Sequence, residues 1–82
     1  MDKQYERNMI MGFSFKPLWR LLIDRDMTKT EYREALGLST ATLAKMGKDE
    51  YVSMEVLDKT CNYFGVPLHD VIEHTKSETP PE

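Results

Sequence analysis

The fold is decided by residues 27–46, MTKTEYREALGLSTATLAKM, in which two short helical patterns flank a glycine. Thr28 or Thr30 can cap the first helix, and Glu31 stands three residues after Thr28, as in a capping box. Gly37 then ends this helix at a position that favours a positive φ. The sequence therefore predicts a helix, a tight turn and a second helix.

The second helix of this pair begins at Ser39 as its N-cap, and Gly47 and Asp49 allow it to stop. The residues expected to face the protein interior are Tyr32, Ala35 and Leu36 in the first helix and Leu43 and Met46 in the second. The residues expected to face outward from the second helix are Thr40, Ala41, Thr42, Ala44 and Lys45. Small side chains let a helix approach base edges, and threonine suits both bases and phosphates. This pattern is typical of a helix-turn-helix.

A further helix is predicted before this pair, where Pro17 fits the first turn of a helix that starts at Lys16. One face of this helix follows the spacing i, i+3, i+4 and i+7 through Leu18, Leu21, Leu22 and Arg25, and its three leucines are apolar. Trp19 and Ile23 form a second apolar pair beside that face. We expect either residues 11–15 or a second subunit to cover this pair.

Two helices are predicted after the pair. Ser53 caps the first, and Gly65 ends it. Pro67 starts a short fifth helix. The expected apolar residues are Met54, Leu57, Cys61 and Phe64 in the fourth helix and Leu68, Val71 and Ile72 in the fifth. The chain thus reads as an all-α, five-helix bundle that requires no strand.

The domain organisation is one small domain, since 82 residues are too few for two. We expect an N-terminal arm over 1–15, a helix-turn-helix domain over 16–73 and a disordered tail over 74–82. Met11, Phe13 and Phe15 alternate with the period of a strand, but over only five residues. Either a short strand or a frayed arm is compatible with that pattern.

Composition argues against several classes of protein. The longest apolar run is far shorter than the roughly 18 residues that a membrane span needs. The single cysteine, Cys61, leaves no internal disulfide, and His69 and His74 have no second pair of ligands for a metal. No catalytic constellation is present, so we expect neither an enzyme nor a cofactor. A reducing compartment, the cytoplasm, is the expected location.

Charge is distributed unevenly along the chain. Residues 16–48 carry seven basic and four acidic side chains, whereas residues 49–82 carry two basic and eight acidic ones, within a formal net charge of −3. This asymmetry suggests that one face is offered to an anion, although an acidic protein can show such a split without any function.

Residues 27–46 resemble the lambda-repressor-like, Cro-type (XRE) helix-turn-helix family. The resemblance continues through SMEVL at 53–57 and FGVPL at 64–68, and it covers about residues 16–73. It implies the fold of that family, binding to double-stranded DNA, and a homodimer whose recognition helices lie about 34 Å apart. The recognition helix would span residues 39–47.

The resemblance also implies which residues contact DNA. Lys29 occupies the first position of the family's second helix, which suits a phosphate, and Lys48 lies in the loop after the recognition helix. The full set of expected DNA-binding residues is Thr28, Lys29, Ser39, Thr40, Ala41, Thr42, Ala44, Lys45 and Lys48. Weaker candidates for the same face are Lys16, Arg25 and Arg33.

Three positions depart from the family pattern. An arginine and a glutamate that often pair in the family are replaced by Leu22 and Gly47, so that no buried charge is left unpaired. Thr60 stands where an aliphatic residue is usual. The recognition helix also lacks arginine, asparagine and glutamine, the side chains that read bases with two hydrogen bonds. Specificity would then rest on DNA shape and flanking contacts.

We therefore interpret the chain as a sequence-specific DNA-binding transcriptional regulator that acts as a homodimer, with repression and activation both open. One alternative is an antitoxin-like subunit or another protein-interaction module on the same scaffold, with a protein partner. A second alternative is an architectural factor that bends DNA. Salt dependence of DNA binding distinguishes the first alternative from a regulator, and DNA bending distinguishes the second.

Overall fold

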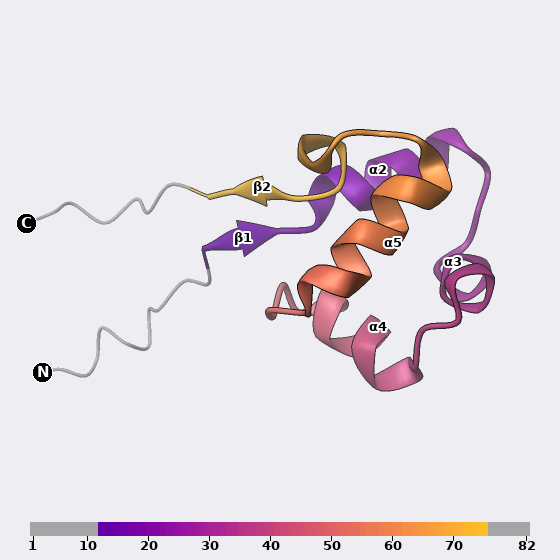
Figure 1. Cartoon of the computed structure of the whole chain (residues 1–82), viewed down its shortest axis with the longest axis horizontal. Coiled ribbons are helices and arrows are strands. Elements are labelled where there is room, and N and C mark those ends of the chain that lie inside the picture. The colour runs from indigo at the N-terminus through magenta and orange to yellow at the C-terminus, as the bar shows by residue number, and fades with distance from the viewer. Residues whose placement is uncertain (1–11, 76–82) are drawn as a thin grey trace, which may run out of the picture.

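The computed structural model describes residues 12–75, which form four α-helices and a two-stranded sheet (Figure 1). The elements in chain order are β1 (Phe13–Ser14), α2 (Lys16–Asp24), α3 (Lys29–Leu36), α4 (Thr40–Gly47), α5 (Met54–Phe64), the 3-10 turn η1 (Leu68–Asp70) and β2 (Glu73–His74). The four helices agree with the sequence prediction, and their bundle encloses one apolar core.

The helix caps are where the sequence predicted them. Ser39 and Ser53 accept backbone N–H groups at the starts of α4 and α5. Gly37 and Gly65 end α3 and α5 with φ of 69° and 67°. These local signals fix the helix boundaries because each cap satisfies backbone groups that the helix itself leaves unpaired.

The start of α2 is held by distant parts of the chain. Its N-cap, Phe15, donates its N–H to Asp49, and Leu18 donates its N–H to the carbonyl of Val71. Lys16 donates its backbone N–H to the nearby Ser14 hydroxyl. Pro17 has no N–H to satisfy, so every backbone donor of this first turn is accounted for.

The core is built mainly from α2, α3 and the segment after α5. Its buried apolar residues are Phe15, Leu18, Leu22, Tyr32, Leu36, Leu38, Met46, Phe64, Val71 and Ile72. Leu22 is 2% exposed, which explains why an apolar residue can replace a charged one at this position. Thr60 is fully buried and shares a 2.6 Å hydrogen bond with the Tyr32 hydroxyl.

The expected fifth helix is wrong, since the chain makes only the single turn η1 after Pro67. The turn η1 ends at Asp70, and Val71 and Ile72 after it are both buried. The chain instead becomes extended and forms β2.

The expectation that the domain needs no strand is also wrong. β1 pairs with β2 in antiparallel fashion, with Phe13 opposite His74 and Ser14 opposite Glu73 (Figure 1). A very short strand therefore forms near Phe13, but its buried residue is Ser14 and Phe13 is 38% exposed, so the apolar alternation does not mark its buried face. This pairing brings residues expected in the arm and the tail into the fold. Residues 1–11 and 76–82 lie outside the described part.

Three residues expected on apolar faces are exposed, and Leu68 in η1, at 46%, is one of them. Met54, in the first turn of α5, is 76% exposed, because α5 buries the face that carries Thr60 and Phe64 and Met54 lies away from that face. Ala35 is exposed because α3 buries only the stripe formed by Tyr32 and Leu36. Of the apolar pair on α2, Trp19 packs near Phe15, but Ile23 remains 74% exposed.

Candidate nucleic-acid interface

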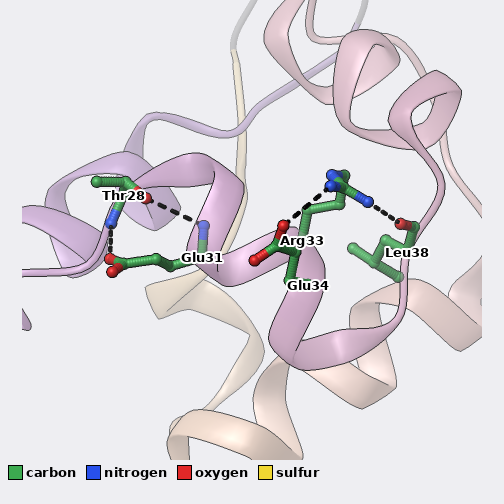
Figure 2. A network of polar contacts seen from close by, with 5 residues as sticks. All are labelled: Thr28, Glu31, Arg33, Glu34 and Leu38. Atoms are coloured by element: carbon green, nitrogen blue, oxygen red, sulfur yellow. Dashed lines mark hydrogen bonds and ion pairs between the residues drawn. The ribbon is translucent and has the colours of Figure 1, made fainter.

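The start of α3 is fixed by a complete capping box (Figure 2). The Thr28 hydroxyl accepts the N–H of Glu31 at 3.0 Å, and the Glu31 carboxylate accepts the N–H of Thr28 at 2.8 Å. Both side chains are exposed, so the box fixes the helix end without help from the core. Lys29, the first residue of α3, thus projects from a well-defined backbone position.

The turn between α3 and α4 is closed by backbone and side-chain bonds. Leu38 donates its N–H to the carbonyl of Arg33, and Arg33 returns a side-chain bond to the Leu38 carbonyl at 3.2 Å (Figure 2). Glu34 lies 3.5 Å from the same guanidinium. Leu38 is buried, which anchors the turn to the core. These contacts set the orientation of α4 relative to α3.

The first turn of α4 is held by Ser39 and Thr42. The Ser39 hydroxyl accepts the N–H of Thr42 and donates to the Thr42 hydroxyl, both at 3.0 Å. Both side chains are therefore engaged in the cap, and Thr42 is half-buried. Neighbouring Thr40 and Ala41 are exposed and form no such contacts within residues 12–75.

The outer face of α4 carries mostly small side chains, and its charged residues are positive. Met46 is fully buried and Leu43 packs against the core, so the opposite side faces solvent. The exposed residues of this side, with the one that follows the helix, are Thr40, Ala41, Ala44, Lys45 and Lys48. The only long side chains on this face are the two lysines. Because the other side chains are small, the helix backbone can come close to the surface of a binding partner.

The predicted DNA-binding residues lie on two helices that pack against each other. Thr28 and Lys29 are at the start of α3, and the others lie between Ser39 and Lys48 on α4 and its flanks. All are exposed except the half-buried Thr42. The arrangement makes them available for contact, while their roles in binding DNA stay predictions.

Lys29 has a neighbour that the sequence did not indicate. Its ammonium nitrogen lies 4.3 Å from the centre of the Trp19 ring on α2. A cation placed over an aromatic face is attracted by the electron-rich ring. Neither residue suggests the other in the sequence, because the contact depends on how α2 and α3 pack.

Two of the three weaker candidates are used within the fold. Arg33 stabilises the turn between α3 and α4, because its guanidinium donates a hydrogen bond to the Leu38 carbonyl. Arg25 donates to the Phe64 carbonyl at 3.4 Å and lies over the Phe64 ring, so it interacts with the C-terminal end of α5. Lys16 is exposed at the start of α2.

No helix within residues 12–75 is both long and apolar enough to cross a membrane. In the same stretch, no group of three or more histidine, cysteine, aspartate or glutamate side chains is placed to hold a metal ion.

Comparison with known proteins shows similarity to a protein family and to a solved structure. Residues 17–77 match the family described as the Cro/C1-type HTH DNA-binding domain. The chain is also similar to the crystal structure of the transcriptional regulator VanUg, form II, with a TM-score of 0.76 and 43% sequence identity. That similarity covers 94% of this chain and 100% of the other. The search among curated proteins gives no match.

Proposed function

The chain belongs to the Cro/C1-type helix-turn-helix family of DNA-binding regulators, and from this premise we propose that it controls transcription as a homodimer bound to a specific duplex sequence. In this proposal α4 enters the major groove and α3 crosses the phosphate backbone, which is how helix-turn-helix units dock. The similarity to VanUg, a transcriptional regulator, supports the same type of function.

The observation that carries the proposal is the outer face of α4. Thr40, Ala41 and Ala44 are exposed and small, and Lys45 is exposed beside them. A helix with this surface can approach base edges without a clash, and the Lys45 ammonium can donate to guanine acceptors. Lys29 and Lys48 then supply contacts to phosphates on either side.

The homodimer is supported by an apolar groove next to the loop that follows α4. The groove has a volume of about 350 Å³, and its lining includes Phe13, Tyr51, Met54 and Leu68. Tyr51 and Met54 are 60% and 76% exposed, so this patch is open to a partner. A second copy seated here would lie beside the end of α4. We propose this face as the dimer contact because it is apolar and exposed and lies beside the end of α4, so that pairing here would bring two recognition helices close together.

Titration of a labelled mixed-sequence duplex by fluorescence anisotropy tests the proposal. Binding at about 50 mM salt that weakens steeply at about 200 mM is expected for a protein that contacts phosphates. Selection of bound sequences from a random pool should then yield a two-fold symmetric site. Absence of binding at the lower salt concentration would contradict the proposal.

The second candidate is a protein-interaction module, which the same apolar groove and the acidic residues after Lys48 favour. A protein of this kind would bind a partner protein and show no salt-sensitive affinity for duplex DNA.

Measurement of the end-to-end distance of a doubly labelled duplex distinguishes a regulator from a DNA-bending factor, because only a DNA-bending factor must shorten that distance strongly.

A further inference from the structure

The Trp19 ring is fixed on the surface of α2. Its centre lies 6.4 Å from that of Phe15, which is only 3% exposed, and Trp19 itself is half-buried against the core. The ring is therefore held by packing before any ligand arrives. The Lys29 ammonium lies over it at 4.3 Å.

The charge of Lys29 is not neutralised by this contact. Among residues 12–75 no carboxylate forms an ion pair with Lys29. An aromatic ring attracts a cation through its quadrupole but carries no net charge, so the ammonium keeps its full attraction for an anion. The ring also limits the conformations of a long, flexible side chain, which reduces the entropy that this side chain loses on binding.

We propose that Trp19 is a positioning residue that holds the Lys29 ammonium ready for a phosphate of the DNA backbone. This inference rests on the proposed DNA-binding function, in which α3 crosses the backbone and Lys29 begins α3. Trp19 acts through Lys29 and needs no contact of its own with DNA. The pair would raise affinity for any duplex sequence, since phosphate contacts carry no sequence information.

Four variants test this role: W19L, W19F, K29M and the double variant W19L/K29M. Leucine keeps an apolar side chain against Phe15 but has no aromatic face, whereas phenylalanine keeps a face. W19L should weaken binding of a labelled mixed-sequence duplex by about two- to fivefold, the factor expected for an exposed cation–π contact, and W19F should weaken it less. K29M should weaken binding and reduce the slope of log affinity against log salt by about one.

The double variant shows whether Trp19 acts through Lys29. If it does, W19L has no further effect in the K29M background. Because Trp19 is the only tryptophan of the chain, its fluorescence also reports directly on this site. Its emission should change when the wild-type protein binds DNA and should change much less in K29M. Thermal melting of each variant checks that all four remain folded.

Three results would overturn the positioning role while the wild-type protein still binds DNA: unchanged affinity in W19L, tighter binding in W19L, or an equal loss with and without Lys29. Tighter binding would mean that the ring withholds the lysine from phosphate. Failure of the wild-type protein to bind the duplex at about 50 mM salt would instead overturn the proposed function, and the role of Trp19 with it.

Discussion

The Asp49 carboxylate accepts the backbone N–H of Phe15, 34 residues earlier in the chain, at 2.9 Å. Asp49 follows the end of α4 and has a φ of 58°, in the left-handed region, whereas Phe15 is the N-cap of α2. One side chain thus joins the exit of the proposed recognition helix to the start of the first helix. Asp49 meets two demands, since it must tolerate positive φ and supply a hydrogen-bond acceptor.

Variants of Asp49 separate these two demands. D49G keeps the left-handed backbone but removes the acceptor, so the partly buried N–H of Phe15 loses its partner. The free energy of unfolding should fall by about 1–2 kcal/mol. D49N keeps an oxygen acceptor and also tolerates positive φ, so it should unfold close to the wild type. Urea unfolding measures both, and equal midpoints for D49G and the wild type would show that the bond contributes nothing.

The pair formed by Tyr32 and Thr60 should behave as a unit. Thr60 donates its single hydroxyl hydrogen to the Val56 carbonyl at 2.8 Å, so the Tyr32 hydroxyl donates to Thr60. T60V keeps the shape but leaves the buried Tyr32 hydroxyl unpaired, and it should cost about 1–3 kcal/mol.

The double variant Y32F/T60V removes both partners and should recover much of that loss. The measurement is a double-mutant cycle of unfolding free energies. Additive losses in this cycle would mean that the two hydroxyls are energetically independent despite their contact. The pair also explains how a threonine can replace an aliphatic residue in this core.

Stability should fall at high pH because of the same tyrosine. Burial raises the pKa of Tyr32 above its ordinary value of about 10. Above pH 10 the unfolded state therefore releases a proton that the folded state retains, and the free energy of unfolding decreases as pH rises further. The decrease should be smaller in Y32F than in the wild type. Parallel curves for the two proteins between pH 9 and 11 would argue against this role.

Local chemistry made most of the helices predictable. Ser39, Ser53, Gly37 and Gly65 each act within a few residues of their position, so their spacing alone defined the helix ends. The outward face of α4 followed from placing Leu43 and Met46 inward, and of its five predicted residues four are exposed and Thr42 is half-buried.

The features that escaped prediction depend on tertiary contacts. β2 forms because β1 lies beside it, 59 or more residues away in the chain. The exposure of Met54 depends on which face of α5 packs against the other helices, and the bond from Phe15 to Asp49 depends on the whole fold. In the candidate interface, the use of Arg33 in the turn and the contact of Lys29 with Trp19 likewise need the packed structure.

Substitution of Gly47 should stabilise the domain. This glycine is the last residue of α4, its φ is not positive, and an added Cβ would meet no atom within 4 Å. G47A should raise the free energy of unfolding by about 0.5–1 kcal/mol, because alanine loses less backbone entropy on folding. G37A is the matched comparison: its site is equally open, but its φ of 69° strains any side chain. A stabilised G37A, or a destabilised G47A, in thermal unfolding would contradict this reading.

Lys45 and Lys48 should affect DNA binding in different ways. Lys45 is exposed on the outer face of α4, and Lys48 is exposed just after the helix. If Lys45 reads a base, K45A should weaken binding of a selected site by about 1–3 kcal/mol and relax the preference at one base position. K48A should weaken binding to all sequences alike and reduce the salt slope by about one, as expected for a phosphate contact.

The matched control for both variants is K59A, which removes an exposed lysine from α5, outside the helix-turn-helix. Anisotropy titrations of the selected site and of a scrambled duplex should show K59A close to the wild type. A loss in K59A as large as in K45A would mean that net charge, rather than the face of α4, determines affinity. A loss in K45A that is the same for both duplexes would assign Lys45 to the phosphate backbone, and sequence preference would then have to come from the small residues of α4 or from DNA shape.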